Sequence, residues 1–172
     1  MARKAQAFSM SSTLATKREN LAAARRELAT LVESGPTFAP AFAIANQIAR
    51  MGETHGFTQW LYASPSVDTS WDGKKSYSLD VHLEATGVDS LKTGPVASMC
   101  EAMLDLGLDP VGSVDYASEY MADRTFKFKG QAGLVDVHVK LVANIKRDAA
   151  GCRKVQTGTE LKEVATYAIV CD

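Results

Sequence analysis

Two stretches of the sequence place an aspartate and a histidine two residues apart: Asp80 with His82, and Asp136 with His138. Apolar residues alternate with polar ones around both, which predicts two β-strands carrying these side chains on their polar faces. Carboxylates and imidazoles are common ligands of zinc and iron, so neighbouring strands could bring four of them together. Alternation alone also produces such polar rows, and Lys140 would repel a cation. A metal-dependent enzyme is therefore our second alternative.

No other motif points to catalysis. The sequence has no Gly-x-Ser-x-Gly elbow, and Cys100 falls on an apolar helical stripe where packing explains it. Residues 130–133 (Gly-Gln-Ala-Gly) are not followed by a helix that would aim its N–H groups at a phosphate. We expect no catalytic residues and no cofactor.

Basic residues gather near the N-terminus. Residues 1–50 hold seven Lys or Arg against three Glu, whereas the rest of the chain holds twelve against seventeen acidic residues. Lys17, Arg18, Arg25 and Arg26 recur at spacings of seven or eight, which places them on roughly one face of a helix. A basic helix can follow phosphates, so nucleic-acid binding is the first alternative function. Glu19 lies on the same helix, and a solvated charged surface produces the same pattern.

The same region carries a leucine pattern. Leu14, Leu21 and Leu28 repeat every seven residues and Leu31 follows at the alternate spacing, with Lys17 interrupting the seam. The pattern predicts a helix from about Thr13 to Glu33, and Gly35-Pro36 is expected to end it. Three heptads could pair with another copy or a partner helix, or dock on the protein's own sheet. A non-catalytic interaction protein that uses this seam is our leading prediction.

The remaining elements predict an α+β fold in two layers. We expect a mobile arm over residues 1–11, two helices within residues 12–52, and an α+β body over residues 53–172. Its antiparallel sheet of about five strands is centred on a hairpin of residues 125–145, which turns at residues 130–133. Strands at residues 77–85 and 162–170 flank this hairpin, and a helix over residues 95–106 covers one face.

Three shorter segments complete the prediction. A strand over residues 57–63 should stop at Ser64-Pro65, and Asp72-Gly73 should form a tight turn. Residues 114–123 fit a strand or a helix, and we favour a short helix in which Asp115 is the cap. Residues 148–151 are expected to form a turn before a strand at residues 152–156.

Composition supports a soluble protein with a real core, since 46% of its residues are hydrophobic and the net charge is −1. Cys100, Cys152 and Cys171 form no Cys-x-x-Cys pair and are odd in number, which favours free thiols in a reducing cytoplasm. Cys152 and Cys171 become neighbours only if their strands pair. The N-terminus lacks the apolar segment of a signal peptide and we find no membrane-spanning run, so no membrane partner is predicted.

Overall fold

A computed structural model describes residues 10–117, 122–146, 152–159 and 165–171. The predicted arm over residues 1–11 and the turn over 148–151 fall largely or wholly outside these ranges. The helices are α1 (Met10–Thr54) and α2 (Pro95–Asp105). The strands are β1 (Trp60–Thr69), β2 (Lys75–Val88), β3 (Asp109–Ala117), β4 (Ala122–Ala132), β5 (Val135–Ile145), β6 (Cys152–Thr159) and β7 (Ala165–Cys171). The chain divides into two compact units, Met1–Pro36 and Thr37–Asp172.

The N-terminal helix α1 is continuous, whereas the sequence predicts two helices separated at Gly35-Pro36. Proline removes one backbone N–H and crowds the carbonyl four residues earlier. Both Pro36 and Pro40 lie on the exposed side of α1, so water can hydrate the carbonyls that lose their intrahelical partners. The helix therefore continues through both prolines to Thr54. The unit boundary at Pro36 divides it into a first half, residues 10–36, and a second half, residues 37–54.

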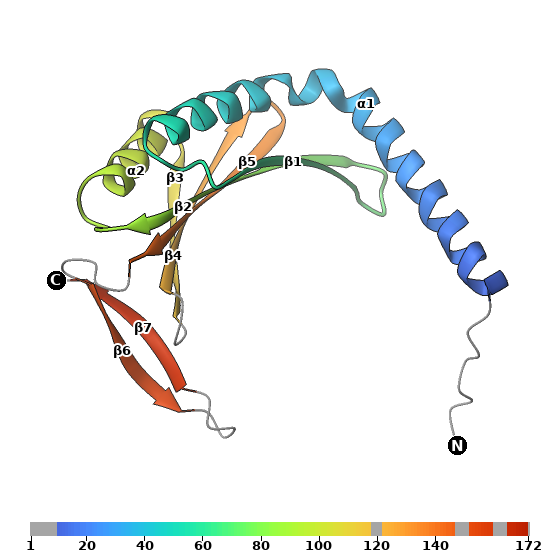
Figure 1. Cartoon of the computed structure of the whole chain (residues 1–172). Coiled ribbons are helices and arrows are strands. Elements are labelled where there is room, and N and C mark those ends of the chain that lie inside the picture. Colours follow the sequence, from blue (N-terminus) through green and yellow to red (C-terminus); the bar gives the residue numbers. More distant parts are fainter. Residues whose placement is uncertain (1–9, 118–121, 147–151, 160–164, 172) are drawn as a thin grey trace. The chain divides into compact units, whose positions relative to one another are not determined.

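A five-stranded sheet in the order β1-β2-β5-β4-β3 forms the body (Figure 1). Its neighbours are antiparallel except for β2 and β5, which are parallel. The sheet is thus mixed, and the purely antiparallel prediction is wrong. Alternation of apolar and polar residues is the same in strands of either direction, so it could not reveal this. The parallel pair arises because α2, β3 and β4 intervene between β2 and β5 and return the chain to the end of the sheet at which β2 begins.

The central hairpin of the prediction is confirmed, but its turn is shorter. Strand β4 continues through Gly130 to Ala132, which pairs with Val135, so only Gly133 and Leu134 make the turn. Gly133 has φ 64°, a conformation that glycine adopts without strain. Gly130 lies within β4 and allows close packing, because a Cβ at this position would overlap Cδ2 of Leu108.

Three strand predictions need correction. Strand β1 does not stop at Pro65, because among the described strands β1 pairs with β2 alone, and an edge strand tolerates a residue without an N–H. The described part of residues 114–123 is strand, not helix: Asp115 is opposite Arg124 on β4, and the Arg124 Nε lies 2.5 Å from its carboxylate. The C-terminal strand does not flank the central hairpin; β7 pairs with β6 in a separate two-stranded sheet.

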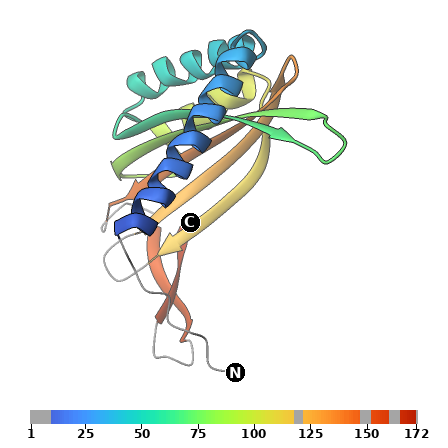
Figure 2. The same ribbon diagram turned by 90° about the vertical axis from the view of Figure 1, so that its right-hand side faces the viewer.

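One face of the five-stranded sheet is covered by α2 and by the second half of α1 (Figures 1 and 2). Phe38 of α1 packs edge-on against Tyr77 of β2, with ring centroids 5.8 Å apart. The predicted helix over residues 95–106 is confirmed as α2, and Pro95 begins it. The buried core joins α1 and α2 residues to the inward rows of the central strands: Phe38, Ala41, Ala45, Ile48, Val96, Met99, Met103, Leu79, Val81, Leu83, Val135, Val137, Val139 and Leu141.

Candidate functional site

The parallel pairing of β2 and β5 brings the two Asp-x-His segments side by side. Asp80 is opposite His138, whereas His82 is opposite Lys140, so the repeats are offset by two residues. Asp136 is opposite Ser78 and completes the four candidate ligands on one polar face. In the part of the chain that the structure describes, no group of three His, Cys, Asp or Glu could hold a metal ion. The offset explains this, because a lysine takes the place where a second histidine would be needed.

This polar face of the sheet lies opposite the face that α2 and the second half of α1 cover (Figure 1), and we call it the open face. A row of directly paired residues crosses it: Tyr62 on β1, His82 on β2, Lys140 on β5 and Lys127 on β4. Tyr62 and His82 stack with their ring centroids 5.0 Å apart and their planes 7° apart. Burial lowers the pKa of His82, Glu84 opposes that shift and the positive charge of Lys140 adds to it. His82 is therefore neutral at pH 7, and its ring widens the flat aromatic surface that Tyr62 begins.

The other half of the open face carries Lys127, Lys129 and Lys140 together with Asp109, Asp123 and Asp136. Lys127 pairs directly with Lys140, and Lys129 pairs directly with His138. Like charges directly opposite each other destabilise an antiparallel pair. Beside them is an open hollow of about 390 Å³ lined by Ser78, Asp80, Val111, Lys127, Phe128, His138, Val139 and Lys140. The open face thus combines an aromatic stack and a basic block along one row.

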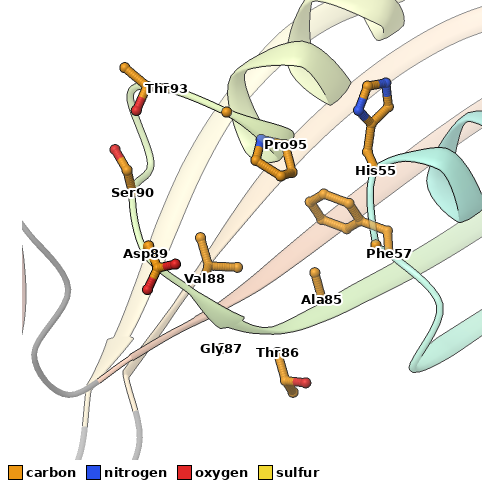
Figure 3. Close-up of a pocket in the computed structure, with 12 residues that line it drawn as sticks. His55, Phe57, Ala85, Thr86, Gly87, Val88, Asp89, Ser90, Thr93 and Pro95 are labelled. Atoms are coloured by element: carbon orange, nitrogen blue, oxygen red, sulfur yellow. The ribbon is translucent and has the colours of Figure 1, made fainter.

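A second hollow, of about 330 Å³, lies where the end of α1, the end of β2 and the start of α2 meet (Figure 3). Gly87, with φ 67°, sits in the irregular end of β2, and Gly94 precedes α2 with φ 71°. The carboxylate of Asp89 is held by Lys146, whose Nζ is 2.8 Å away. His55 and Phe57 line the opposite side of the hollow. These groups form no acid–base pair or nucleophile that would support catalysis.

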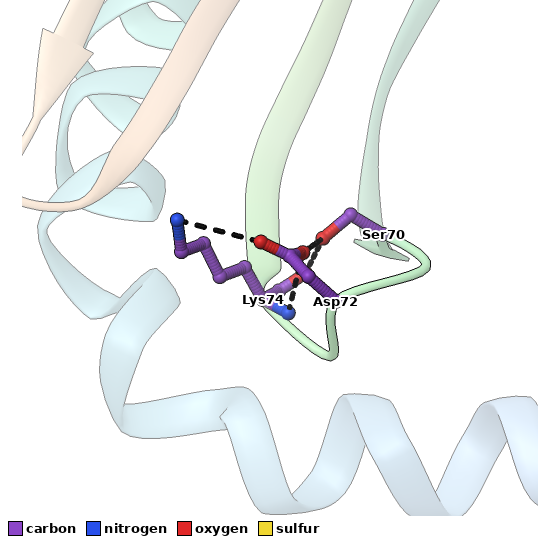
Figure 4. A network of polar contacts seen from close by, with 3 residues as sticks. All are labelled: Ser70, Asp72 and Lys74. Carbon is purple, nitrogen blue, oxygen red and sulfur yellow. Dashed lines mark hydrogen bonds and ion pairs between the residues drawn. The ribbon is translucent and has the colours of Figure 1, made fainter.

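The β1–β2 hairpin presents a fully exposed tryptophan at its tip. Ser70 donates to the carboxylate of Asp72 and to the Lys74 carbonyl oxygen, the latter at 2.9 Å, and Lys74 Nζ lies 3.4 Å from Asp72 (Figure 4). Gly73 has φ 81°, as the predicted Asp72-Gly73 turn requires. Trp71, between Ser70 and Asp72, is 100% exposed. The contacts among Ser70, Asp72 and Lys74 hold the turn together, and none of them involves the indole.

The predicted interface residues lie on the first half of α1. Leu14, Leu21 and Leu28 are 50%, 53% and 61% exposed, and Leu31 is partly buried. Val32, which the leucine pattern omits, is 71% exposed and shares their side of the helix, since eighteen residues make five turns at 3.6 residues per turn. We call Leu14, Leu21, Leu28 and Val32 the apolar stripe. Sequence reasoning could have found Val32 from its spacing of four after Leu28.

The predicted phosphate-binding residues Lys17, Arg18, Arg25 and Arg26 are all exposed on the same half of α1. Arg18 and Arg25 share one side, but Arg26 lies about 100° further round the helix. Its Nε approaches the Ala22 carbonyl oxygen of its own helix at 3.4 Å. Only part of the predicted basic set therefore shares a face.

The helix α1 also has a membrane-like composition. Between Leu14 and Thr54 it contains a segment with mean hydropathy 1.2, of which 22% is buried. By length and composition this helix could cross a membrane, whereas the sequence analysis predicts no membrane-spanning run. The apolar residues of the second half include Phe38, Ala41 and Ile48, which lie in the core. Length and composition alone do not establish a membrane span, and the predicted cytoplasmic location stays a prediction.

The cysteines offer no reactive group among the described side chains. Burial, helped by the neighbouring charge of Glu101, raises the pKa of the Cys100 thiol to about 11, which keeps it protonated and unreactive. On the backbone, Cys152 of β6 pairs with Cys171 of β7, so the two strands do place these positions opposite each other.

In comparisons with known proteins, no family model matches the sequence, and no curated protein matches it. The apolar stripe and the open face are therefore the features of this protein that bear on its function. The stripe follows from the leucine spacing, but the Tyr62–His82 stack does not. It depends on the register in which β1 pairs with β2, and the sequence pattern does not specify that register.

Proposed function

We propose that this protein is a non-catalytic interaction protein that associates with a second copy of itself through the apolar stripe of α1. The observation that carries the proposal is the exposure of Leu14, Leu21, Leu28 and Val32, each at least half accessible to solvent. A helix draws most of its stability from packing an apolar face, and the first half of α1 leaves that face exposed. Covering it would remove large aliphatic side chains from water.

A second copy is the partner that the charges favour. In a parallel pair with heptad packing, Arg25 flanks the seam beside Asn20 of the other copy, so this flanking pair brings no like charges together and only Lys17 meets its own counterpart. Lys17 occupies one seam position. A single charged residue in a seam weakens the pair but fixes its register. Three heptads and one lysine favour a weak dimer that dissociates on dilution. We place it in the cytoplasm, which the odd number of cysteines favours.

Sedimentation across a concentration series tests this proposal on the full chain. Leu21→Glu with Leu28→Glu should convert the dimer to a monomer, because carboxylates would be buried without partners. Lys17→Leu should tighten the dimer. Ala23→Glu is the matched control, since Ala23 is exposed and lies about 180° from Leu14 on the helix.

A wild-type protein that is monomeric at every concentration would contradict self-association, as would a control variant that disrupts the dimer equally. Flotation with phosphatidylcholine vesicles adds a second arm, since a bilayer could also cover an apolar helix. Vesicle binding that is lost in the Leu21→Glu, Leu28→Glu variant would replace the second copy with lipid.

A further inference from the structure

We propose that the open face of the sheet binds single-stranded nucleic acid, with phosphates on Lys127 and Lys140 and a base stacked on Tyr62. This goes beyond self-association, because the surface belongs to the body and uses none of the stripe residues. It also differs from the basic-helix alternative, which relies on Lys17, Arg18, Arg25 and Arg26.

The first argument is uncompensated positive charge. Lys127 and Lys140 are direct neighbours across β4 and β5, and their row contains Tyr62, His82 and Gly112 but no carboxylate. Neither lysine forms an ion pair with any residue that the structure describes. Two ammonium groups held this close repel each other, and an anion between them removes the repulsion.

The second argument is the aromatic end of the same row. Tyr62 is 50% exposed and lies flat against His82, so one face of the pair is braced and the tyrosine stays accessible. Unpaired bases stack on tyrosine and histidine rings, whatever their sequence. A ring that is already held in place loses little conformational freedom when a base covers it.

Carboxylates on β2 oppose anion binding at one side of the face and so orient the ligand. Asp80 and Glu84 flank His82 on β2, and Glu84 accepts a hydrogen bond from Asn144. They repel phosphates from β2, as Asp136 does at the start of β5, whereas Lys127 and Lys140 attract phosphates where they pair across β4 and β5. The neutral bases can cover β1 and β2, where the aromatic pair lies.

The shape of the face favours a strand over a free nucleotide. Four strands separated by about 4.8 Å make the row roughly 14 Å long, so phosphates over β4 and β5 and a base on Tyr62 of β1 lie too far apart to belong to one nucleotide. Pockets for single small molecules are usually enclosed, whereas the hollow beside Lys140 opens to solvent. A polymer that contacts several points along the row fits an open surface better.

Fluorescence anisotropy with a labelled twenty-nucleotide oligo-dT tests the proposal on the full chain. Lys127→Ala with Lys140→Ala should weaken binding and lower the slope of log K against log salt by roughly 1.4, about 0.7 per phosphate contact. Tyr62→Ala should weaken binding about tenfold with little change in that slope, because it removes stacking rather than charge. A duplex of the same length should bind more weakly, since its bases are not accessible.

The control variant is Lys74→Ala with Lys92→Ala, which removes the same charge from exposed lysines outside the row and should leave affinity within twofold. Melting curves should show the Lys127→Ala, Lys140→Ala protein folded and no less stable than wild type. The proposal is overturned if wild type does not bind oligo-dT, or if the control weakens binding as much as the row variant. It is also overturned if Arg25→Ala with Arg26→Ala abolishes binding while the row variant retains it, which would assign the activity to α1.

Discussion

The two halves of α1 share one continuous helix and a similar alanine-rich composition, yet their apolar residues have opposite surroundings. In the second half, Phe38 and Ile48 are almost completely buried in the core of the body. In the first half, Leu14, Leu21 and Leu28 are at least half exposed. Helical periodicity thus identifies an apolar side but does not say what covers it. The fold accounts for the apolar residues of the second half, and the proposed dimer would cover those of the first half.

The two sides of β5 show the same contrast within one strand. Val135, Val137 and Val139 are buried beneath the helices, whereas Asp136 and His138 face solvent on the open face. Alternation predicted these facings correctly. Substitutions at two adjacent residues of β5 can therefore compare the covered face with the open face through their effects on the free energy of unfolding.

The largest expected effect is Val137→Asp. This change buries a carboxylate with no partner at a fully buried position and should cost about 4 kcal/mol or more of unfolding free energy. His138→Ala, one residue away on the open face, should cost less than about 0.5 kcal/mol. Urea unfolding followed by circular dichroism measures both, with the same slope m expected for each protein. A histidine change that proved more damaging than the valine change would mean that the open face is covered in solution.

A smaller effect should separate the halves of α1. Ile48→Ala removes a fully buried side chain and should destabilise the protein by about 2–5 kcal/mol, since a cavity remains. Leu28→Ala should change stability by less than about 0.5 kcal/mol when measured at concentrations where the protein is monomeric. Alanine has a higher helix propensity than isoleucine or leucine, so a loss of stability in either variant comes from lost packing and not from helix propensity. At high concentration Leu28→Ala should become destabilising as well, because the dimer then contributes to stability. Equal costs at low concentration would show that the stripe already packs within the monomer.

Much of the body follows from local sequence, and the rest depends on long-range pairing. Period-two alternation predicted β2 and the β4–β5 hairpin, and the three–four spacing of Val96, Met99 and Met103 predicted α2. Alternation carries no information on strand direction, so the parallel β2–β5 pair was missed. Proline was misjudged twice, at Pro36 and Pro65, because its cost depends on whether the lost hydrogen bond faces water or lies at a sheet edge.

The candidate surfaces divide in the same way. The apolar stripe is local, since residues seven apart on a helix share a side whatever surrounds them, and sequence alone located most of it. The open-face row exists only when four strands pair in one register, because Tyr62, His82, Lys140 and Lys127 each come from a different strand. Asp80, His82, Asp136 and His138 were rightly placed on polar faces, but the two-residue offset between β2 and β5 set Lys140 opposite His82. Among the described residues, these four side chains share the open face without forming a group of three that could hold a metal ion.

The smallest expected effect concerns pH and the stack of Tyr62 on His82. Burial is the main cause that lowers the pKa of His82 below its ordinary value of 6.5, while Glu84 opposes the shift and Lys140 adds to it. The unfolded chain therefore takes up this proton at a higher pH than the folded protein does. Stability is fully present above pH 6.5 and declines as pH falls through that value toward the lower folded pKa.

His82→Gln should remove this contribution and flatten the dependence of stability on pH just below 6.5. The change should be small, because His82 is only partly buried and solvent screens much of the shift. Tyr62→Ala sharpens the test: without the covering ring the imidazole becomes hydrated, its pKa rises toward the ordinary value, and the pH dependence should shrink in the same direction. Urea unfolding at half-unit pH intervals from 7.5 to about 5 measures both variants against wild type. Curves for both variants that run parallel to wild type across this range would show that the stack does not shield His82 in solution, and the open-face row would then lack its rigid aromatic end.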